Sequence, residues 1–287
     1  VEGGLCGDDQ DAPRCFICLE TRAASGEELL RGCACRGSAG YAHVQCLADA
    51  ACVNNDMWHA CTTCRQPWAG QLALGLAQSH WNRVKDQPED GRERLSAAMA
   101  LAWSRVANAE QSDKAVKLAK QALVDAQKYY KDDDDDILSA MGWLAAVHGA
   151  TGNHKEALRL AETVLKAFRH KHGNDHAWTM SALNNLAVML KRLGKYAEAL
   201  PLHEEALAGT RRNRGDGHWQ TLTSTGNLAE LHIVMGNPEL AYPLLEQALL
   251  GTQRLLGREH PDTIVLASKF NLLQTKLDKQ SPSVQQK

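Results

Sequence analysis

Eight cysteine and histidine side chains in four close pairs constrain the start of this 287-residue chain more than any other feature. Two residues separate the members of three pairs, and one residue separates those of the fourth. Thiolate and imidazole are the usual ligands of closed tetrahedral zinc sites, and two such sites need eight ligands. The pattern therefore predicts a finger that binds two zinc ions. The pairs are Cys15 and Cys18, Cys33 and Cys35, His43 and Cys46, and Cys61 and Cys64.

The same stretch has a Gly- and Ala-rich middle, which leaves little apolar volume for a core. We expect bound metal to supply much of its folding free energy. A disulfide framework is the alternative interpretation, but CxxC pairs with an interposed histidine have metal spacing. Cys6 and Cys52 have no ligand-spaced partner, and we interpret Cys52 as a small buried residue. No cysteine follows residue 64, which favours a reducing compartment. We therefore expect a cytoplasmic protein, with the nucleus as the alternative.

The order and spacing of the ligands resemble the RING-CH (variant RING) zinc finger of ubiquitin ligases. The segment 33–47 is the most telling, because it has a CxC pair and a Gly-Ser turn before the histidine. The PHD finger, which reads histone tails, is the nearest alternative. It spaces its second pair more widely and places Trp two residues before the seventh ligand, whereas Trp58 lies three before Cys61. The resemblance implies cross-braced zinc binding, with one ion held by Cys15, Cys18, His43 and Cys46 and the other by Cys33, Cys35, Cys61 and Cys64.

The resemblance also implies contacts with a ubiquitin-conjugating enzyme and with ubiquitin. In RING-type ligases the finger forms no covalent intermediate and holds the ubiquitin thioester in a reactive pose. Ile17 matches the apolar contact residue of the first zinc loop. Arg65 matches an Arg that hydrogen-bonds both the conjugating enzyme and ubiquitin, a role suited to the guanidinium fork. Pro67 continues that loop, and Trp58 is expected either to add apolar contact surface or to pack the finger's core.

Two departures favour a second interpretation, a non-enzymatic scaffold whose finger is PHD-like or inert. The Trp that usually follows the sixth ligand by four residues is Ala50, and the Pro often found after the seventh ligand is Thr62. In that case the protein would act only through protein–protein interaction.

A repeat with a period of 42 residues fills the rest of the chain. Thr179, Thr221 and Thr263 recur at this interval, and so do a series of Ala residues and a series of Leu residues. A fixed period with small residues in one slot and Leu in another predicts stacked two-helix units whose apolar faces cover one another. The small slot is Ala115, Ala157, Ala199 and Ala241, and the large one is Leu123, Leu165, Leu207 and Leu249.

The segments 183–187, 194–199 and 259–263 resemble tetratricopeptide repeats of the kinesin-light-chain kind. The resemblance implies four repeats near 95–136, 137–178, 179–220 and 221–262, and a closing helix at 263–277. The first helices would line a concave groove for a protein or peptide partner. Asn185 and Asn227 share a slot and are expected to hold an extended peptide. The basic residues of the groove favour acidic ligands, although Glu230 opposes this. The expected groove residues are Trp143, Asn184, Asn185, Val188, Lys191, Arg192, Asn227, Glu230 and Lys269.

Other functional classes find no support in the sequence. No Gly-rich phosphate loop, GxSxG elbow or HExxH motif is present. A net charge of −2 gives no electrostatic case for nucleic acid, and no apolar run is long enough to span a membrane. The repeated His176, His218 and His260 suit loops before helix starts better than a metal site. The acidic run 132–136 is interpreted as a solvated loop.

We therefore predict a mostly α-helical chain, with a small zinc-stabilised RING-CH finger followed by an all-α tetratricopeptide solenoid. Its function is predicted to be that of a ubiquitin ligase that recruits a partner through the repeats. The chain begins at Val1 rather than at a methionine, so a fragment is one interpretation. The expected segments are a disordered 1–12, the finger at 13–69, a connecting helix and turn at 70–94, the solenoid at 95–277 and a disordered tail at 278–287.

Overall fold

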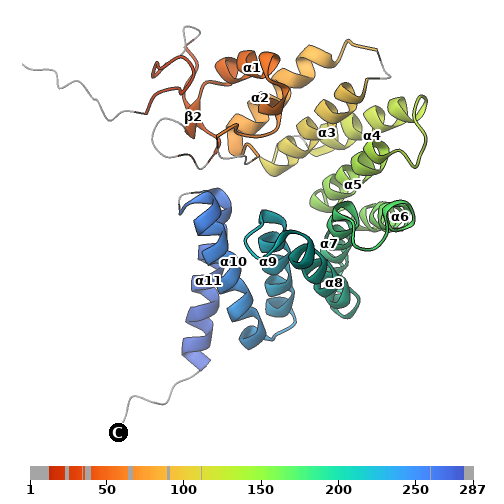
Figure 1. Cartoon of the computed structure of the whole chain (residues 1–287), viewed down its shortest axis with the longest axis vertical. Coiled ribbons are helices and arrows are strands. Elements are labelled where there is room, and N and C mark those ends of the chain that lie inside the picture. The colour runs from red at the N-terminus through yellow and green to blue at the C-terminus, as the bar shows by residue number, and fades with distance from the viewer. Residues whose placement is uncertain are drawn as a thin grey trace, which may run out of the picture. The chain divides into compact units, whose positions relative to one another are not determined.

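The computed structural model describes residues 13–22, 26–33, 35, 40–63, 67–88, 91–110, 112–258 and 260–280. The chain divides into two compact units, Val1–Asn82 and Arg83–Lys287 (Figure 1). The second unit is built from helices, as the sequence predicts, and the chain as a whole is mostly helical. None of the helices in the described ranges is both long and apolar enough to cross a lipid bilayer.

The first unit combines a two-stranded sheet with short helices. Strands β1 (Leu30–Arg31) and β2 (Tyr41–Ala42) pair antiparallel, with Leu30 opposite Ala42. Helix α1 (Val44–Val53) and the 3-10 helix η2 (Asn55–Trp58) follow, and α2 begins at Gly70 and ends at Val84. The core is small, because Leu47, Leu72 and Leu76 are its largest fully buried aliphatic side chains and several cysteines lie among them.

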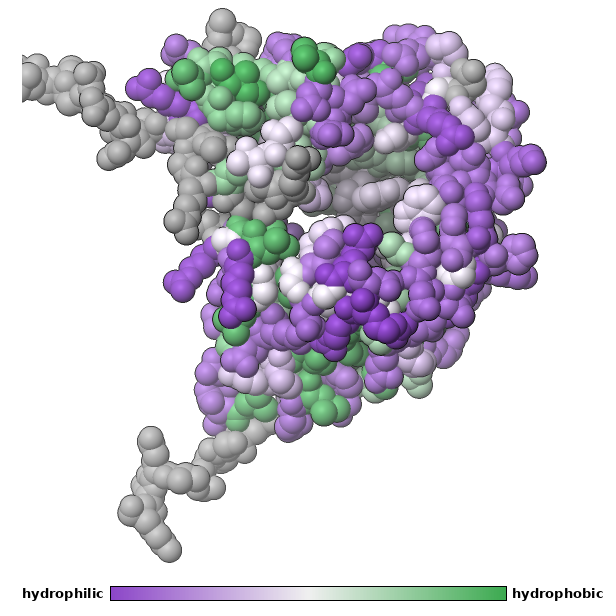
Figure 2. All heavy atoms as spheres, viewed as in Figure 1, coloured by the Kyte–Doolittle hydropathy of each residue, from purple (hydrophilic) through white to green (hydrophobic). Residues whose placement is uncertain are grey.

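The second unit is a series of antiparallel helix pairs whose first helices begin 42 residues apart from α5 onward. The final helix packs on α10 through Phe270 and Leu273, and so covers the last pair as expected. Its other side exposes Ile264 and Leu272, and Figure 2 shows apolar patches among hydrophilic atoms on this part of the surface. The helices are α3 (Arg92–Ala107), α4 (Ser112–Gln127), α5 (Asp135–Ala150), α6 (His154–His172), α7 (Ala177–Arg192), α8 (Tyr196–Arg214), α9 (Trp219–Val234), α10 (Pro238–Leu256) and α11 (Pro261–Gln280).

Both repeat slots have the roles that the sequence predicts. All four Ala residues of the small slot are fully buried, and the four Leu residues are at most 8% exposed. Small side chains let paired helices approach closely, and the Leu side chains fill the space that remains. The first helices α3, α5, α7 and α9 also pack against one another in sequence, which places them along one side of the array.

The repeated histidines begin helices. His176 is the N-cap of α7, and its ring accepts a hydrogen bond from the Trp178 backbone N–H at 3.3 Å. His218 caps α9 in the same way, and its ring accepts a hydrogen bond from the Gln220 backbone N–H at 3.2 Å. Each ring therefore satisfies one of the free N–H groups of a helix start. This agrees with their interpretation as residues of inter-repeat loops.

The interpretation of the acidic run as a solvated loop is only partly right, because residues 132–133 form an exposed turn whereas Asp135 and Asp136 belong to α5. Asp134 is the N-cap of α5 and accepts a hydrogen bond from the Asp136 backbone N–H. Arg92 of α3 pairs with Asp134 at 3.0 Å, and His172 of α6 lies 2.8 Å from the Asp135 carboxylate. Acidic side chains are favourable at a helix N-terminus, where the helix dipole is positive. The run thus starts one helix and ties two others to it.

Candidate metal centre and repeat groove

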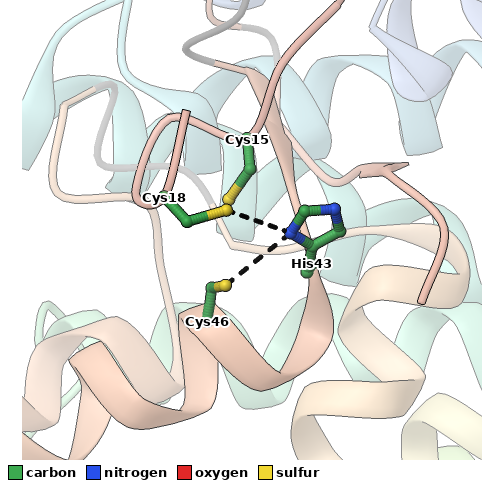
Figure 3. Close-up of side chains that lie close together, drawn as sticks. All are labelled: Cys15, Cys18, His43 and Cys46. Carbon is green, nitrogen blue, oxygen red and sulfur yellow. Dashed lines mark hydrogen bonds between the residues drawn. The ribbon is translucent and has the colours of Figure 1, made fainter. Parts of the chain in front are cut away.

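Four predicted ligands meet where the first loop of the finger approaches α1. Their ligand atoms all lie within 4.8 Å of one another. Cys15 and Cys18 sit on a tight turn in which the Leu19 N–H donates to the Cys15 carbonyl at 2.8 Å. His43 caps α1, and Cys46 lies in its first turn. Figure 3 shows the two sulfurs of Cys18 and Cys46 on the Nδ1 side of the His43 ring.

The distances suit a tetrahedral metal ion. Zinc bonds of ~2.3 Å to sulfur and ~2.0 Å to nitrogen put two sulfurs ~3.8 Å apart, and a sulfur and a nitrogen ~3.5 Å apart. Nδ1 of His43 lies 3.4 Å from Cys18 Sγ and 3.6 Å from Cys46 Sγ. The cluster therefore has the size of a zinc cage, with Nδ1 as the ligand nitrogen.

A second cluster brings together Cys33, Cys35 and Cys61, all buried. Cys35 Sγ and Cys61 Sγ are 3.7 Å apart, the separation of two sulfurs on one zinc ion. Cys64, the predicted fourth ligand of this site, lies outside the described residues. The grouping of both clusters is the one that the resemblance implies, and it indicates zinc binding.

Three cysteine thiols of the two clusters have a shifted pKa. Burial raises the pKa of the Cys46 thiol to about 12 and also raises the pKa of Cys33. Burial acts in the same direction on Cys15, but hydrogen bonds from the backbone of Cys18 and His43 outweigh it and lower that pKa. Buried thiolates need a nearby positive charge, and a coordinated cation supplies one.

The predicted contact residues of the finger differ in exposure. Ile17 is 36% exposed and Pro67 is exposed, whereas Arg65 lies outside the described residues. Trp58 is only 7% exposed and stacks on His80 with ring centroids 4.4 Å apart. Its role is therefore core packing, and it offers no contact surface.

Two further features of the finger were not foreseen. Leu19, which follows the second ligand, is 65% exposed and adds apolar surface beside Ile17. Cys52 is exposed, so its interpretation as a small buried residue is wrong. It lies on the solvent side of α1, while Ala51 beside it is fully buried.

Several predicted groove residues bond to one another. Asn184 of α7 accepts a hydrogen bond from the Asn227 side chain of α9 at 3.1 Å, and His203 Nδ1 lies 3.1 Å from the same oxygen. Asn185 is exposed. The two amides predicted to hold an extended peptide are therefore not equivalent, because Asn227 already bonds within the array.

The predicted basic character of the groove is offset within the array. Glu230 of α9 lies between two lysines, with Lys191 of α7 at 2.7 Å and Lys269 of α11 also in contact. Hydrogen bonds from both ammonium groups lower the pKa of the Glu230 carboxyl against its burial, which acts to raise it. Val188 is half-buried, and Arg192 is exposed.

A cavity of about 390 Å³ opens along the first helices. Trp143, Asn184 and Asn185 line it, as predicted groove residues. Sequence reasoning missed Trp103, Trp178 and Trp219, which also line it. The sequence did hold a hint of this aromatic lining, because four of the chain's seven tryptophans fall in the repeats. These tryptophans do not share a slot of the 42-residue period, so the repeat pattern does not place them together.

Family models match both parts of the chain. A RING-variant domain model matches residues 15–66. Tetratricopeptide repeat models match residues 136–212 and 221–262. The chain thus contains a RING-variant finger and tetratricopeptide repeats. No curated protein matches it.

Solved structures resemble the array. BtubC (BKLC) from P. vanneervenii is 20% identical with a TM-score of 0.54, and the match covers 75% of this chain and 94% of that one. A Podosopora anserina putative kinesin light chain with nearly identical TPR-like repeats is 23% identical, with a TM-score of 0.51 and coverages of 74% and 95%. PlcR of Bacillus thuringiensis, solved with the peptide PapR7 and DNA, is 15% identical, with a TM-score of 0.53 and coverages of 80% and 73%. At these identities the likeness shows the fold alone.

Proposed function

We propose that this chain, a RING-variant finger followed by tetratricopeptide repeats, is a RING-CH-type ubiquitin-protein ligase that recruits a protein partner through its repeats. The observation that carries the proposal is Ile17, an exposed apolar side chain on the loop between Cys15 and Cys18. The RING-CH resemblance places the contact with the conjugating enzyme on this loop, between the first two zinc ligands. Leu19 extends that surface.

The finger would hold two zinc ions, one in each ligand cluster. The first would be bound by Cys15, Cys18, His43 and Cys46, and the second by Cys33, Cys35, Cys61 and Cys64. The ions would be structural, and would fix the loops that carry the contact residues.

The residues of this chain would act by positioning. Ile17 and Leu19 would bind a ubiquitin-conjugating enzyme, and Pro67 would border the same contact. Arg65 would hydrogen-bond both the enzyme and ubiquitin, because a guanidinium presents several donors in a fixed plane. Holding the thioester in a reactive geometry lowers the barrier to transfer without a covalent intermediate.

An autoubiquitination assay with a panel of conjugating enzymes tests this proposal. We expect Ile17→Ala and Arg65→Ala each to reduce ubiquitin transfer by at least about tenfold while the zinc content stays unchanged. Leu240→Ala is the matched control, because Leu240 is an exposed aliphatic residue of the repeats and not of the finger. Equal transfer by wild type and both finger variants would rule out the assigned roles.

A non-enzymatic scaffold is the second candidate, and two observations favour it. Ala50 stands where RING-CH fingers have a Trp, and Trp58 is buried in the core, so neither provides aromatic contact surface. If no conjugating enzyme in the panel supports ubiquitin transfer by the zinc-loaded chain, the non-enzymatic scaffold becomes the better interpretation of its function.

The repeats would recruit a partner in either case. Stacked helical repeats commonly bind proteins along their inner surface. Asn185 and Arg192 are exposed on α7 and free to contact such a partner. We place this activity in the cytoplasm, with the nucleus as the alternative.

A further inference from the structure

The cavity along the first helices has an aromatic wall that the proposed function leaves unexplained. Trp143 of α5 is 47% exposed, Trp178 of α7 is 40% exposed and Trp219 of α9 is 56% exposed. Trp103 of α3 lies with its ring centroid 5.8 Å from that of Trp143. Tryptophan is costly to leave in water, and exposed Trp on successive elements marks a binding surface.

The aromatic wall is uncharged. Apart from apolar and aromatic residues, the lining consists of Gly, Ser, Thr, Asn and Gln side chains. Two of the predicted groove lysines, Lys191 and Lys269, are paired with Glu230, and Arg192 does not line the cavity. An acidic ligand would find no unpaired positive charge in this lining to compensate its desolvation, so charge complementarity favours an uncharged ligand.

The step between neighbouring first helices favours one backbone conformation for a ligand that spans them. Neighbouring packed helices lie ~8–10 Å apart. A polyproline II segment has three residues per turn and rises ~3.1 Å per residue, so side chains on one face recur every ~9 Å. A β-strand repeats each face after two residues, or ~6.6 Å, and residues three apart point to opposite faces. The polyproline period therefore matches the step from one first helix to the next.

Hydrogen-bond donors are present in the same wall. Polyproline II makes no internal hydrogen bonds, so all its carbonyl groups need partners. The exposed Asn185 amide and the indole N–H of Trp143 make no hydrogen bond within the described residues. Proline-rich segments are generally bound in grooves lined by aromatic side chains.

We propose that the groove lined by Trp103, Trp143, Trp178 and Trp219 binds an uncharged, proline-rich segment of a partner protein in the polyproline II conformation. The proposal rests on the recruiting role of the repeats and is independent of ubiquitin transfer. It replaces the acidic extended peptide that the basic residues suggest from sequence alone.

Direct binding to the purified, zinc-loaded full chain tests this. The probe is a capped, fluorescein-labelled peptide of repeated Pro-Pro-Gln, followed by fluorescence anisotropy. Peptides of equal length with repeated Gly-Gly-Gln or Pro-Pro-Glu serve as comparisons, since the first is uncharged but flexible and the second is stiff but acidic. We expect the Pro-Pro-Gln peptide to bind at least about tenfold more tightly than either comparison peptide, a difference of ~1.4 kcal/mol.

Two variants locate the contact. Trp143→Ala should weaken binding by about tenfold or more, since buried Trp side chains carry much of the energy of interfaces. Gly142→Leu should do the same by filling the groove, because a Cβ at Gly142 meets no atom within 4 Å. This change also improves helix propensity, and an unchanged far-UV circular dichroism spectrum would show that a loss of binding is not due to unfolding. Tyr129→Ala, at an exposed aromatic outside the lining, should leave affinity unchanged.

Several outcomes would overturn the proposal. Tighter binding of Pro-Pro-Glu would assign the groove to acidic ligands. Equal binding of Pro-Pro-Gln and Gly-Gly-Gln, or no binding of either, would remove the polyproline argument. Self-association that Trp143→Ala abolishes, seen by sedimentation, would mean that a second copy fills the groove. None of these results bears on the ligase assay, so the two proposals fail separately.

Discussion

The finger and the repeat array are stabilised in opposite ways. In the finger, two clusters of cysteine and histidine lie among a few buried leucines, so a small number of ligand bonds would fix the fold. In the array, the same small and large slots recur in every helix pair, and burial is spread over many side chains. The two units should therefore respond differently to substitution. Replacing a single zinc ligand should unfold the finger, whereas a substitution in the array should lower its stability only in proportion to the apolar volume removed.

Loss of one ligand gives the largest expected effect. Cys33→Ser should remove zinc from the second cluster and unfold the finger, because structural zinc contributes on the order of 10 kcal/mol to domains of this kind. The array should remain helical, because its core does not involve the finger's ligands. Zinc content and far-UV circular dichroism measure the two effects.

Cys52→Ser is the matched control for this variant. Cys52 is exposed and lies in neither ligand cluster, so its zinc content and helicity should equal those of wild type. If Cys33→Ser unfolds the whole chain, the two units are not independently stable and the comparison fails.

A cavity in the array should have the next largest effect. Leu183→Ala, at a fully buried position of α7, should lower the free energy of unfolding by about 2–5 kcal/mol. Zinc content should not change. Leu240→Ala, at an exposed site on α10, should cost less than about 0.5 kcal/mol. Urea unfolding, monitored by the helical circular dichroism signal, compares the two variants. Equal unfolding midpoints for both would contradict the burial argument.

The array should also lose stability in acid through a buried histidine. Burial lowers the pKa of His203 to about 4 from an ordinary value of 6.5, with the Lys191 charge as a further cause and Glu230 opposing it. The unfolded chain takes up this proton below pH 6.5 while the folded chain does not. Stability is therefore full above pH 6.5 and falls, by roughly 3 kcal/mol in total, as the pH drops towards 4.

Thermal unfolding of the helical signal between pH 7 and pH 4 measures this loss. His203→Gln removes the titrating group, so its unfolding temperature should fall less over the same range. A wild type and variant with parallel pH profiles would show that other groups control the acid response.

The smallest expected effect concerns a single backbone position. Ala109 has a φ of +57°, where the corresponding loops of later repeats use glycine, such as Gly152 with a φ of +84°. A residue with a side chain is strained there, so Ala109→Gly should stabilise the array by about 1 kcal/mol. Gly152→Ala should shift the unfolding midpoint in the opposite direction. Shifts of the same sign would show that the first loop is not equivalent to the later ones.

The sequence by itself determined the ligand pairs, the helix pairs and the inner slots. Each depends on spacing along the chain, which is one or two residues between paired ligands and a period of 42 residues between equivalent positions of the repeats. Ala199 and Leu207 are buried as their slots predict, and Cys15 meets His43 in the grouping that the resemblance implies. Such patterns survive folding, because local geometry repeats wherever the same residues recur.

The tertiary structure alone decided which side chains meet between elements. It stacked Trp58 on His80, bonded Asn227 to Asn184 and placed Glu230 between two lysines. It also gathered tryptophans that share no slot of the period into one groove. The physical reason is that contacts between helices depend on their packing and on side-chain rotamers, which no single-helix pattern encodes.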